Sequence, residues 1–272
     1  MKVKIYSHLT CPTSYRLYKR LWERGVINSV VFRDMGLDLF SGVIRGIVSV
    51  PSVFYGDVLI YSGYFDVDEA ARVIESKALP IIDSFDYGEA SVLAMEGILD
   101  SYATALWLYL TDSIESPLAV KPFIEAVSRH IFYRGRSSES YERLAEEIRE
   151  LYRDEKNLYV ERLREIVARN IVREIIWLGR DPRKYREKID RDYLEHLLLA
   201  RAALGRIGLF MGYKTEIHKK RVEELYEHLQ KTWDELSEKV GNEIKKILGD
   251  QLYVRDYISL TTACPSMVID YR

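Results

Sequence analysis

The residues best suited to chemistry in this 272-residue chain are residues 11–14, with the sequence Cys-Pro-Thr-Ser. Residues 2–6 alternate in polarity as a strand does, whereas Leu17 and Leu21 fall on one face of a helix. Cys11 is therefore expected at a junction between a strand and a helix. The first N–H groups of a helix lack partners and its dipole is positive there, so a thiolate is stabilised. We predict that Cys11 is a nucleophile whose pKa lies below the free value of ~8.5.

Further secondary structure is predicted in the first 80 residues, and it must position this motif. Gly56 and Asp57 form a two-residue turn, so residues 52–61 are expected to form a hairpin. Asp66 or Asp68 can cap a following helix that runs to about Lys77. The predicted order is βαβαββα, with strands at residues 2–6, 30–33, 49–54 and 58–61 and helices after residue 10, at 36–45 and at 66–77.

This order of elements and two short motifs resemble a known superfamily. Cys-Pro-x-Ser after the first strand and Val-Pro-Ser-Val-Phe at residues 50–54 resemble glutaredoxins and the N-terminal domain of glutathione transferases, which share the thioredoxin fold. The resemblance implies that Pro51 has a cis peptide bond and faces Cys11. It also implies that Val50 offers backbone hydrogen bonds to a bound peptide or thiol.

A third motif extends the resemblance over residues 1–80. Residues 60–66, Ile-Tyr-Ser-Gly-Tyr-Phe-Asp, are similar to the glutaredoxin run Ile-Gly-Gly-Tyr-Asp-Asp, and they depart from it at Ser62 and Phe65. The Glu-Ser pair that a transferase carries near this point has no counterpart in residues 60–66. The residues that the resemblance assigns to substrate binding are Pro12, Thr13, Val50, Pro51, Gly63 and Asp66.

Ser14 takes the place of the second cysteine of a dithiol motif, so Cys11 has no local partner with which to close a disulfide. A single cysteine can still form a mixed disulfide that an outside thiol resolves. The resemblance therefore implies a thiol-disulfide oxidoreductase in which Cys11 and Ser14 are catalytic. Its substrate would be a small thiol or a protein disulfide, with glutathione or another low-molecular-weight thiol as cosubstrate and no bound cofactor.

Composition indicates a cytoplasmic protein without nucleic-acid or membrane partners. The 40 basic and 42 acidic residues leave a net charge of −2, and the short basic runs lack interleaved aromatic residues. Apolar stretches fall short of the ~18 residues that a bilayer span needs, and no leader pattern precedes the first strand. Four asparagines and two glutamines beside 30% charged residues are typical of proteins from hot environments.

Beyond residue 80 the pattern becomes helical, so we predict two domains, at residues 1–80 and 81–272. Apolar residues recur at helical spacing in the stretches 89–110, 117–132, 138–178, 184–205 and 214–248. This all-helical domain resembles that of glutathione transferases, with extra helices between residues 137 and 214. The tail resembles a transferase segment in which Asp256 is buried, on a helix that packs within the second domain.

The second cysteine and the histidines have weaker patterns. Cys264 lies in an uncharged stretch after that helix, and we predict a buried structural residue that does not pair with Cys11. His8 could polarise the thiol, although an exposed loop position is favoured. His196 and His228 lack the Glu-x-x-His spacing of helical metal sites, so no metal site is predicted.

Three other functions stay open. A transferase would use the cysteine of Cys-Pro-x-Ser and bind a small electrophile in a pocket between the domains. A binding or scaffold protein could keep the fold without the chemistry. An iron–sulfur carrier would bridge a cluster between two chains, but its motif has glycine and phenylalanine where Pro12 and Thr13 stand. The sequence also leaves open whether the chain forms a homodimer.

Overall fold

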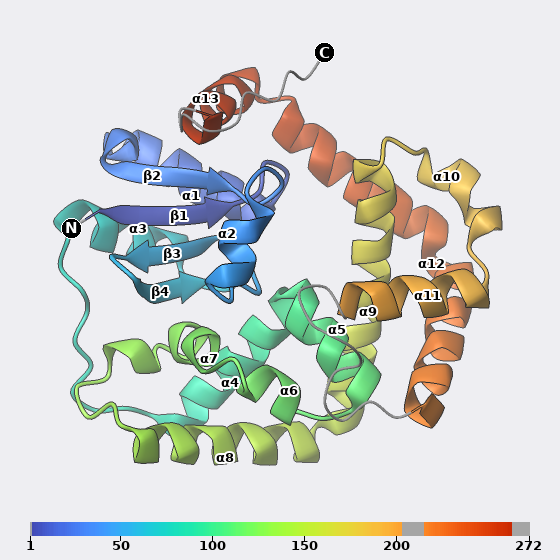
Figure 1. Ribbon diagram of the computed structural model, residues 1–272, viewed down its shortest axis with the longest axis horizontal. Helices are drawn as coiled ribbons and strands as arrows, with labels where there is room; N and C mark the ends of the chain where they lie inside the picture. The colour runs from blue at the N-terminus through green and yellow to red at the C-terminus, as the bar shows by residue number, and fades with distance from the viewer. Residues whose placement is uncertain (1, 203–214, 263–272) are drawn as a thin grey trace.

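The computed structural model describes residues 2–202 and 215–262 (Figure 1). A mixed four-stranded sheet with helices comes first, and a largely helical region follows. The predicted order βαβαββα is confirmed, in the elements β1 (Val3–Ser7), α1 (Pro12–Glu23), β2 (Val30–Asp34), α2 (Leu39–Ile44), β3 (Ser52–Tyr55), β4 (Val58–Ser62) and α3 (Val67–Ser76).

The sheet has the strand order β2-β1-β3-β4. β1 pairs with β2 in parallel and with β3 antiparallel, and β3 and β4 form the predicted hairpin. Alternation along β1 places Ile5 in the core formed with α1 and α3, and Tyr6 on the opposite face against Phe54. Tyr6 pairs with Ser52, so the end of β1 and the start of β3 meet at the same end of the sheet.

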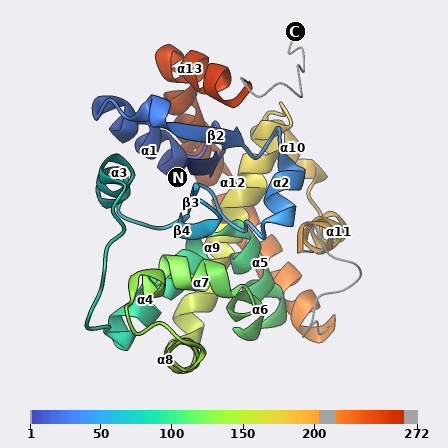
Figure 2. The ribbon, with the colours of Figure 1, turned by 60° about the vertical axis from the view of Figure 1, so that its left-hand side comes forward.

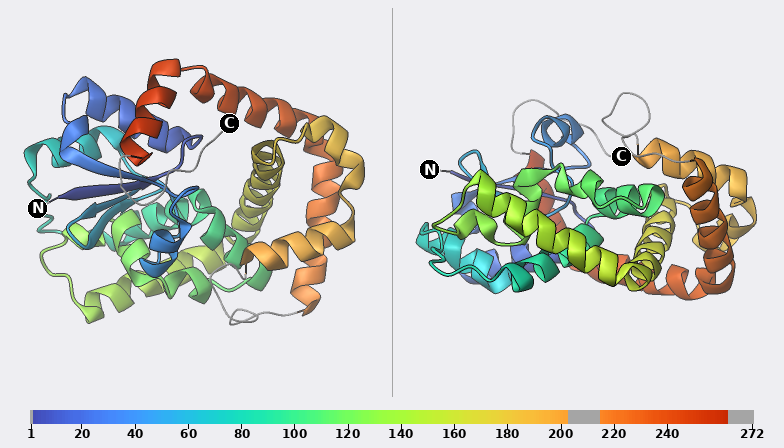
Figure 3. Two further views of the ribbon diagram at one scale, coloured as in Figure 1. Left: turned by 45° about the horizontal axis from the view of Figure 1, so that its top comes forward. Right: turned by 90° about the horizontal axis from the view of Figure 1, so that it is seen from below.

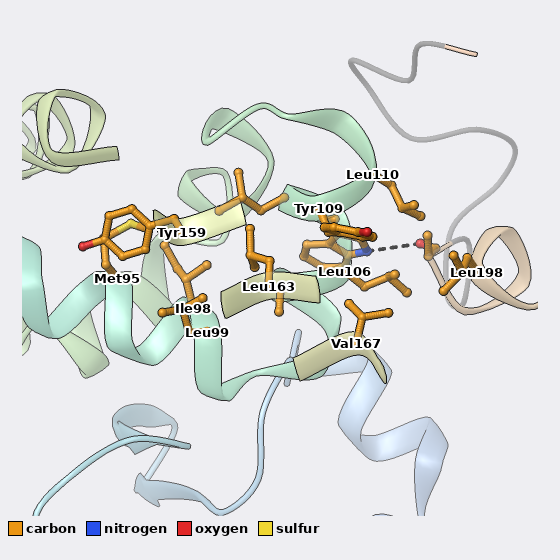
Figure 4. Close-up of a cluster of buried hydrophobic side chains, with 14 of the residues drawn as sticks. Met95, Ile98, Leu99, Leu106, Tyr109, Leu110, Tyr159, Leu163, Val167 and Leu198 are labelled. Atoms are coloured by element: carbon orange, nitrogen blue, oxygen red, sulfur yellow. Dashed lines mark hydrogen bonds between the residues drawn. The ribbon is translucent and has the colours of Figure 1, made fainter. Parts of the chain in front are cut away.

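The helical region has its own core, which Figure 4 shows where α4, α5, α9 and α11 meet. Leu163 and Val167 of α9 are fully buried there, beside Ile98 and Leu106. None of the described helices is both long and apolar enough to cross a lipid bilayer. The helices are α4 (Tyr87–Asp100), α5 (Tyr102–Thr111), α6 (Glu115–Leu118), α7 (Lys121–Val127), α8 (Ser138–Asp154), α9 (Lys156–Trp177), α10 (Pro182–Tyr185), α11 (Arg191–Ala202), α12 (Thr215–Leu248) and α13 (Gln251–Thr262).

The prediction of a single helix at residues 89–110 is wrong, because the helix is interrupted at Ser101, between α4 and α5. Ser101 has extended backbone (φ −83°, ψ 112°) and accepts a hydrogen bond from the Thr104 N–H, which caps α5. Its hydroxyl also donates to the Val48 carbonyl at 2.7 Å, next to the start of β3. Apolar spacing continues across this break, so periodicity alone could not reveal it. The break leaves Asp100 at the end of α4, facing the sheet.

Helix α12 contributes to both cores. Ile244 packs in the helical core, whereas Ile247, one turn later, packs in the core under the sheet. Figure 3 shows α12 running from the helical region towards the side of the molecule where the sheet lies. One rigid element therefore connects the two parts of the molecule.

Helix α13 packs against the sheet, so the prediction that it stays within the helical domain is wrong. Tyr253 and Tyr257 enter the core of the sheet, and Figures 1 and 2 show α13 beside β2, far from α8. The Tyr257 hydroxyl donates to the Asp34 carboxylate at 2.5 Å, and the Tyr253 hydroxyl donates to the Leu9 carbonyl at 2.9 Å. Both tyrosines find apolar cover and hydrogen-bond acceptors at the sheet, which explains why the helix docks there.

Two predictions about the tail have different outcomes. Asp256 was expected to be buried, but 33% of its side chain is exposed, and it accepts a hydrogen bond from the Tyr18 hydroxyl at 3.3 Å. Asp256 thus lies at the edge of the contact between α13 and α1. Cys264 lies outside the described residues, and its burial stays a prediction. The boundary predicted between residues 80 and 81 falls between α3 and α4.

Candidate functional site

Cys11 is the N-cap residue of α1, at the junction predicted from the sequence. Its sulfur accepts a hydrogen bond from the Ser14 N–H at 3.5 Å, and its thiol donates to the Val50 carbonyl, also at 3.5 Å. Pro12 occupies the first turn, where a missing N–H costs nothing. The half-buried cysteine lines a cavity between the sheet and the helices.

The prediction that the Cys11 pKa is lowered is wrong in direction. Burial raises the pKa of the thiol above its ordinary value, and this outweighs the hydrogen bonds from Ser14 and Thr13 that favour the thiolate. The negative charge of Asp100 raises the pKa further. The position at the helix N-terminus was predictable, but the enclosure of the sulfur depends on residues of distant elements.

The predicted partners on β3 lie beside the cysteine. The peptide bond between Val50 and Pro51 is cis, as the resemblance implied, and the Val50 carbonyl faces the sulfur. Thr13 and Val50 line the same cavity as Cys11. Ser14 is buried beneath it, and its hydroxyl accepts the His8 N–H at 3.5 Å.

Gly63 and Asp66 are already engaged in structural contacts. Gly63 has a φ of +59°, and its N–H donates to the Pro51 carbonyl at 2.9 Å. A Cβ atom at this position would lie 2.4 Å from the Ser49 hydroxyl, so only glycine fits. The Asp66 carboxylate caps α3 by accepting two N–H groups of its first turn, at 2.8 and 3.1 Å. Both residues line a second cavity and not the one that contains Cys11.

The cavity at Cys11 has a volume of about 600 Å³. Its wall on the sheet side, named here the cysteine wall, consists of residues 11–13 and 47–50. Figure 1 shows α9, which forms much of the opposite wall, between the sheet and α12. The charged residues of this opposite side, from α4, α9 and α12, are Glu96, Asp100, Arg162, Arg169, Arg173, Glu174 and Glu243.

Three arginines point from one face of α9, because they are seven and four residues apart. Arg162 forms a bidentate ion pair with Glu96, with both bonds at 2.7 Å. Arg169 and Arg173 both pair with the single carboxylate of Glu243 on α12. We name this last group, Arg169, Arg173 and Glu243, the arginine wall. It carries two guanidinium groups for one carboxylate.

The arginine wall also contains polar atoms without partners. The Nε atoms of Arg169 and Arg173 are buried, and among the described residues neither has a hydrogen-bond partner. Arg173 has 14% of its side chain exposed, and this burial lowers the pKa of its guanidinium. A negative charge on the Cys11 sulfur raises the same pKa. Arg173 is therefore close enough to Cys11 for their charges to interact.

Trp177, at the end of α9, connects this helix to the loop before α1. Its indole N–H donates to the Thr10 hydroxyl at 2.9 Å, and its ring lies over His8 with the ring centroids 4.4 Å apart. Burial lowers the pKa of His8, so its imidazole is neutral at pH 7. The prediction that His8 is an exposed loop residue is wrong, because a helix from the second half of the chain covers it.

A second cavity of about 590 Å³ adjoins the first. The two cavities share four lining residues, so they meet at the first turn of α1. Arg16 stands at this meeting point, and it donates to the Thr13 hydroxyl at 3.2 Å. The shared residues are Thr13, Arg16, Tyr64 and Asp100.

Sequence analysis missed Asp100, Trp177 and the arginine wall. The spacing of the arginines along residues 162–173 was visible, and a repeated charge on one face of an amphipathic helix could have suggested a polar cavity. Their partner Glu243 is 70 and 74 residues away in sequence. No spacing rule connects residues so far apart, and only the packing of α9 on α12 brings them together.

Within residues 2–202 and 215–262, no group of three or more His, Cys, Asp or Glu side chains is arranged to hold a metal ion. Comparison of the chain with protein-family models, with curated proteins and with solved structures finds no match. Function therefore has to be inferred from the geometry of the two cavity walls.

Proposed function

We propose that this protein catalyses thiol–disulfide exchange through Cys11, on a thioredoxin-like fold. The position of the Cys11 sulfur carries the proposal, because it caps α1, lies 3.5 Å from the Val50 carbonyl and lines a cavity of about 600 Å³. Cavities of this size accommodate small organic ligands. The strand order β2-β1-β3-β4 and the helices beside the sheet support the fold assignment.

The reaction has two steps. The Cys11 sulfur attacks one sulfur of a disulfide, a new S–S bond forms, the substrate S–S bond breaks, and the leaving thiolate takes up the proton that Cys11 loses. An external thiol then attacks the substrate half of the mixed disulfide and releases Cys11 as a thiol. One half of the original disulfide is released as a thiol, and the other half is joined to the external thiol in a new disulfide.

The surroundings of Cys11 favour a thiol that ionises as it reacts. N–H groups of Thr13 and Ser14 stabilise the developing thiolate, whereas burial keeps the resting sulfur protonated at neutral pH. The protonated form is a weak nucleophile and resists oxidation. The site is thus expected to react with a disulfide held in the cavity faster than with oxidants in bulk solvent.

The test is formation of a mixed disulfide on the full chain. The protein is incubated with 2-hydroxyethyl disulfide, and intact mass with peptide mapping locates the adduct. We expect an adduct on Cys11 that added thiol removes. The Cys11→Ser variant should form none there, and Cys264→Ser should react as the unmodified chain does. An adduct confined to Cys264, or none at all, would contradict the proposal.

A glutathione-transferase-like reaction is the second candidate, and the enclosed cavity between sheet and helices favours it. Such an enzyme would join a thiol to a small electrophile that the cavity binds. Conjugation of glutathione to an aryl halide, measured by absorbance with and without the Cys11→Ser change, separates the two. Conjugation by the unmodified chain above the uncatalysed rate would favour the transferase, and its loss in Cys11→Ser would show that this transferase uses Cys11.

A further inference from the structure

The cavity has an uneven distribution of charge along α9. At one end, Arg162 and Glu96 neutralise each other through two short hydrogen bonds. Glu174 is likewise paired, with Arg201 at 2.9 Å. Near Cys11, by contrast, Arg169 and Arg173 share one carboxylate.

Two further charged residues close to the thiol, Arg16 and Asp100, have opposite charges, so they do not change the excess of guanidinium groups over carboxylates. Asp100 also lines the cavity, where the positive charges of Arg169, Arg16 and Arg173 act on it and the negative charge of Glu96 acts in the opposite direction. Three guanidinium groups therefore face two carboxylates, Asp100 and Glu243. His8 adds no charge at neutral pH, because burial lowers its pKa. Among the charged residues that line this part of the cavity, guanidinium groups therefore outnumber carboxylates by one.

The unpartnered Nε atoms indicate what could balance that charge. A guanidinium presents its donors as a planar fork that matches the two oxygens of a carboxylate. Leaving a buried donor without an acceptor is unfavourable, and a bound acceptor removes that cost. Four arginines of the described residues have such an Nε–H group, and of these only Arg169 and Arg173 line the cavity that contains Cys11.

We propose that Arg173, together with Arg169, binds a carboxylate of the substrate, so that Cys11 reacts selectively with acidic disulfides. The inference rests on the proposed thiol–disulfide exchange and adds the chemical class of its substrate. Trp177 holds α9, and with it the two arginines, opposite Cys11, because its indole N–H donates to the hydroxyl of Thr10, next to the cysteine. Arg162 belongs to the same helix but lies about 16 Å further along its axis.

The experiment compares three disulfides of similar length and different charge. They are 3,3′-dithiodipropionic acid, which is anionic, 2-hydroxyethyl disulfide, which is neutral, and cystamine, which is cationic. The rate of adduct formation at Cys11 is measured by intact mass. Each rate is divided by the rate of the same disulfide with free 2-mercaptoethanol, which corrects for intrinsic reactivity.

We expect the anionic disulfide to react about tenfold faster than the neutral one, and cystamine to react slowest. Arg173→Gln should remove this preference, Arg173→Lys should keep part of it, and Arg162→Gln should leave it unchanged. High salt should reduce the preference in the unmodified chain. Thermal melts of each variant report whether the fold persists, and Arg169→Gln provides a second reading if Arg173→Gln does not fold.

The outcomes separate this inference from the function on which it rests. Adducts that form on Cys11 at equal corrected rates with all three disulfides overturn the selectivity and leave thiol–disulfide exchange intact. A preference that Arg162→Gln removes as fully as Arg173→Gln also overturns it. If no disulfide forms an adduct on Cys11, the exchange reaction itself is wrong, and the substrate class is wrong with it.

Discussion

The two walls of the cavity differ in what they leave unsatisfied. On the cysteine wall, the polar groups around Cys11 are hydrogen-bonded within the protein, including the Ser14 N–H and the Val50 carbonyl. On the arginine wall, two guanidinium groups share Glu243, and both Nε atoms lack partners among the described residues. The polar groups around Cys11 thus find partners within the protein, whereas the guanidinium groups of the second wall have one carboxylate between them. The proposed reactivity and the proposed selectivity thus depend on different walls.

The walls are joined at two places, which makes the comparison testable. Trp177 connects α9 to the loop before α1, and α12 places Ile244 in one core and Ile247 in the other. If these connections are strong, the walls form one cooperative unit. If they are weak, each wall behaves as part of a separate domain.

The largest expected effect comes from truncating the core behind each wall. Leu17→Ala behind the cysteine wall and Leu163→Ala behind the arginine wall each remove a fully buried side chain. Each should lower the free energy of unfolding by about 2–5 kcal/mol. Because α12 joins the cores, both should shift one common transition in denaturant. Exposed Leu252→Ala is the control and should cost less than about 0.5 kcal/mol. Two separate transitions would show that the walls unfold independently.

A smaller change acts on the thiol from the opposite side of the cavity. Asp100 raises the pKa of Cys11, so Asp100→Asn should lower that pKa and increase the thiolate fraction at pH 7.5. Alkylation by iodoacetamide should become about two- to tenfold faster, since one pKa unit is a tenfold change in thiolate. Glu96→Gln, at the neutralised end of the cavity, should leave the rate unchanged. A slower reaction in Asp100→Asn would mean that its carboxylate assists ionisation.

The third prediction concerns the attachment of α13. Asp250 accepts hydrogen bonds from the Lys19 ammonium at 2.9 Å, the Tyr253 N–H at 3.1 Å and the Tyr15 hydroxyl at 2.8 Å, and these contacts lower its pKa to about 2. Because the pKa of Asp250 is lower in the folded than in the unfolded chain, its ionised carboxylate stabilises the fold at any pH above the unfolded pKa of ~3.9. This stabilisation is lost as the pH falls towards 2. Because the carboxylate is partly exposed, Asp250→Asn should cost only about 1 kcal/mol at pH 7.

The pH profile distinguishes this contribution from a general loss of packing. The difference between Asp250→Asn and the unmodified chain should shrink between pH 4 and pH 2, as measured by urea unfolding. Asp57→Asn, whose carboxylate is 85% exposed in its pair with Arg45, is the matched control and should have no measurable effect. A difference that stays constant with pH would mean that the cost does not come from the ionised carboxylate.

The smallest effect is expected at the connection between the walls. Trp177→Ala uncovers His8, so the pKa of that imidazole should rise towards its ordinary value, because burial lowers it at present. Trp177→Phe keeps an aromatic ring over His8 and loses only the bond to Thr10, so the pKa should change less. Titration of the imidazole by NMR measures both. Equal pKa values in the two variants would show that the ring does not shield His8.

The cysteine wall could be predicted because its signals are local. Cys11 precedes a proline and a helical pattern, and Val50-Pro51 precedes a hairpin with a two-residue turn, so each element was visible within a short window. The break at Ser101 was hidden by apolar spacing that continues through it. A local pattern thus predicted the elements around Cys11, and a local pattern also hid the break between α4 and α5.

The arginine wall, the docking of α13 and the Cys11 pKa depend on tertiary structure. Arg169 and Arg173 pair with Glu243 on another helix, and Tyr257 bonds to Asp34, which is 223 residues earlier in the sequence. Neither partner could be predicted from the sequence near these residues. Enclosure of the sulfur needs both walls, so the sequence indicated a helix N-terminus and could not indicate the opposing effect of burial. Charge and burial at the site were therefore the least predictable quantities.

The return of α13 to the sheet has a consequence for how the chain matures on the ribosome. The strands leave the exit tunnel first, but Tyr253 and Tyr257 cover their core only after every intervening helix has been synthesised. Until then, Asp34 and Ser7 lack the hydroxyl of Tyr257 that joins them in the folded protein. The core under the sheet is thus translated early, but its cover is completed only when the last described helix has been synthesised.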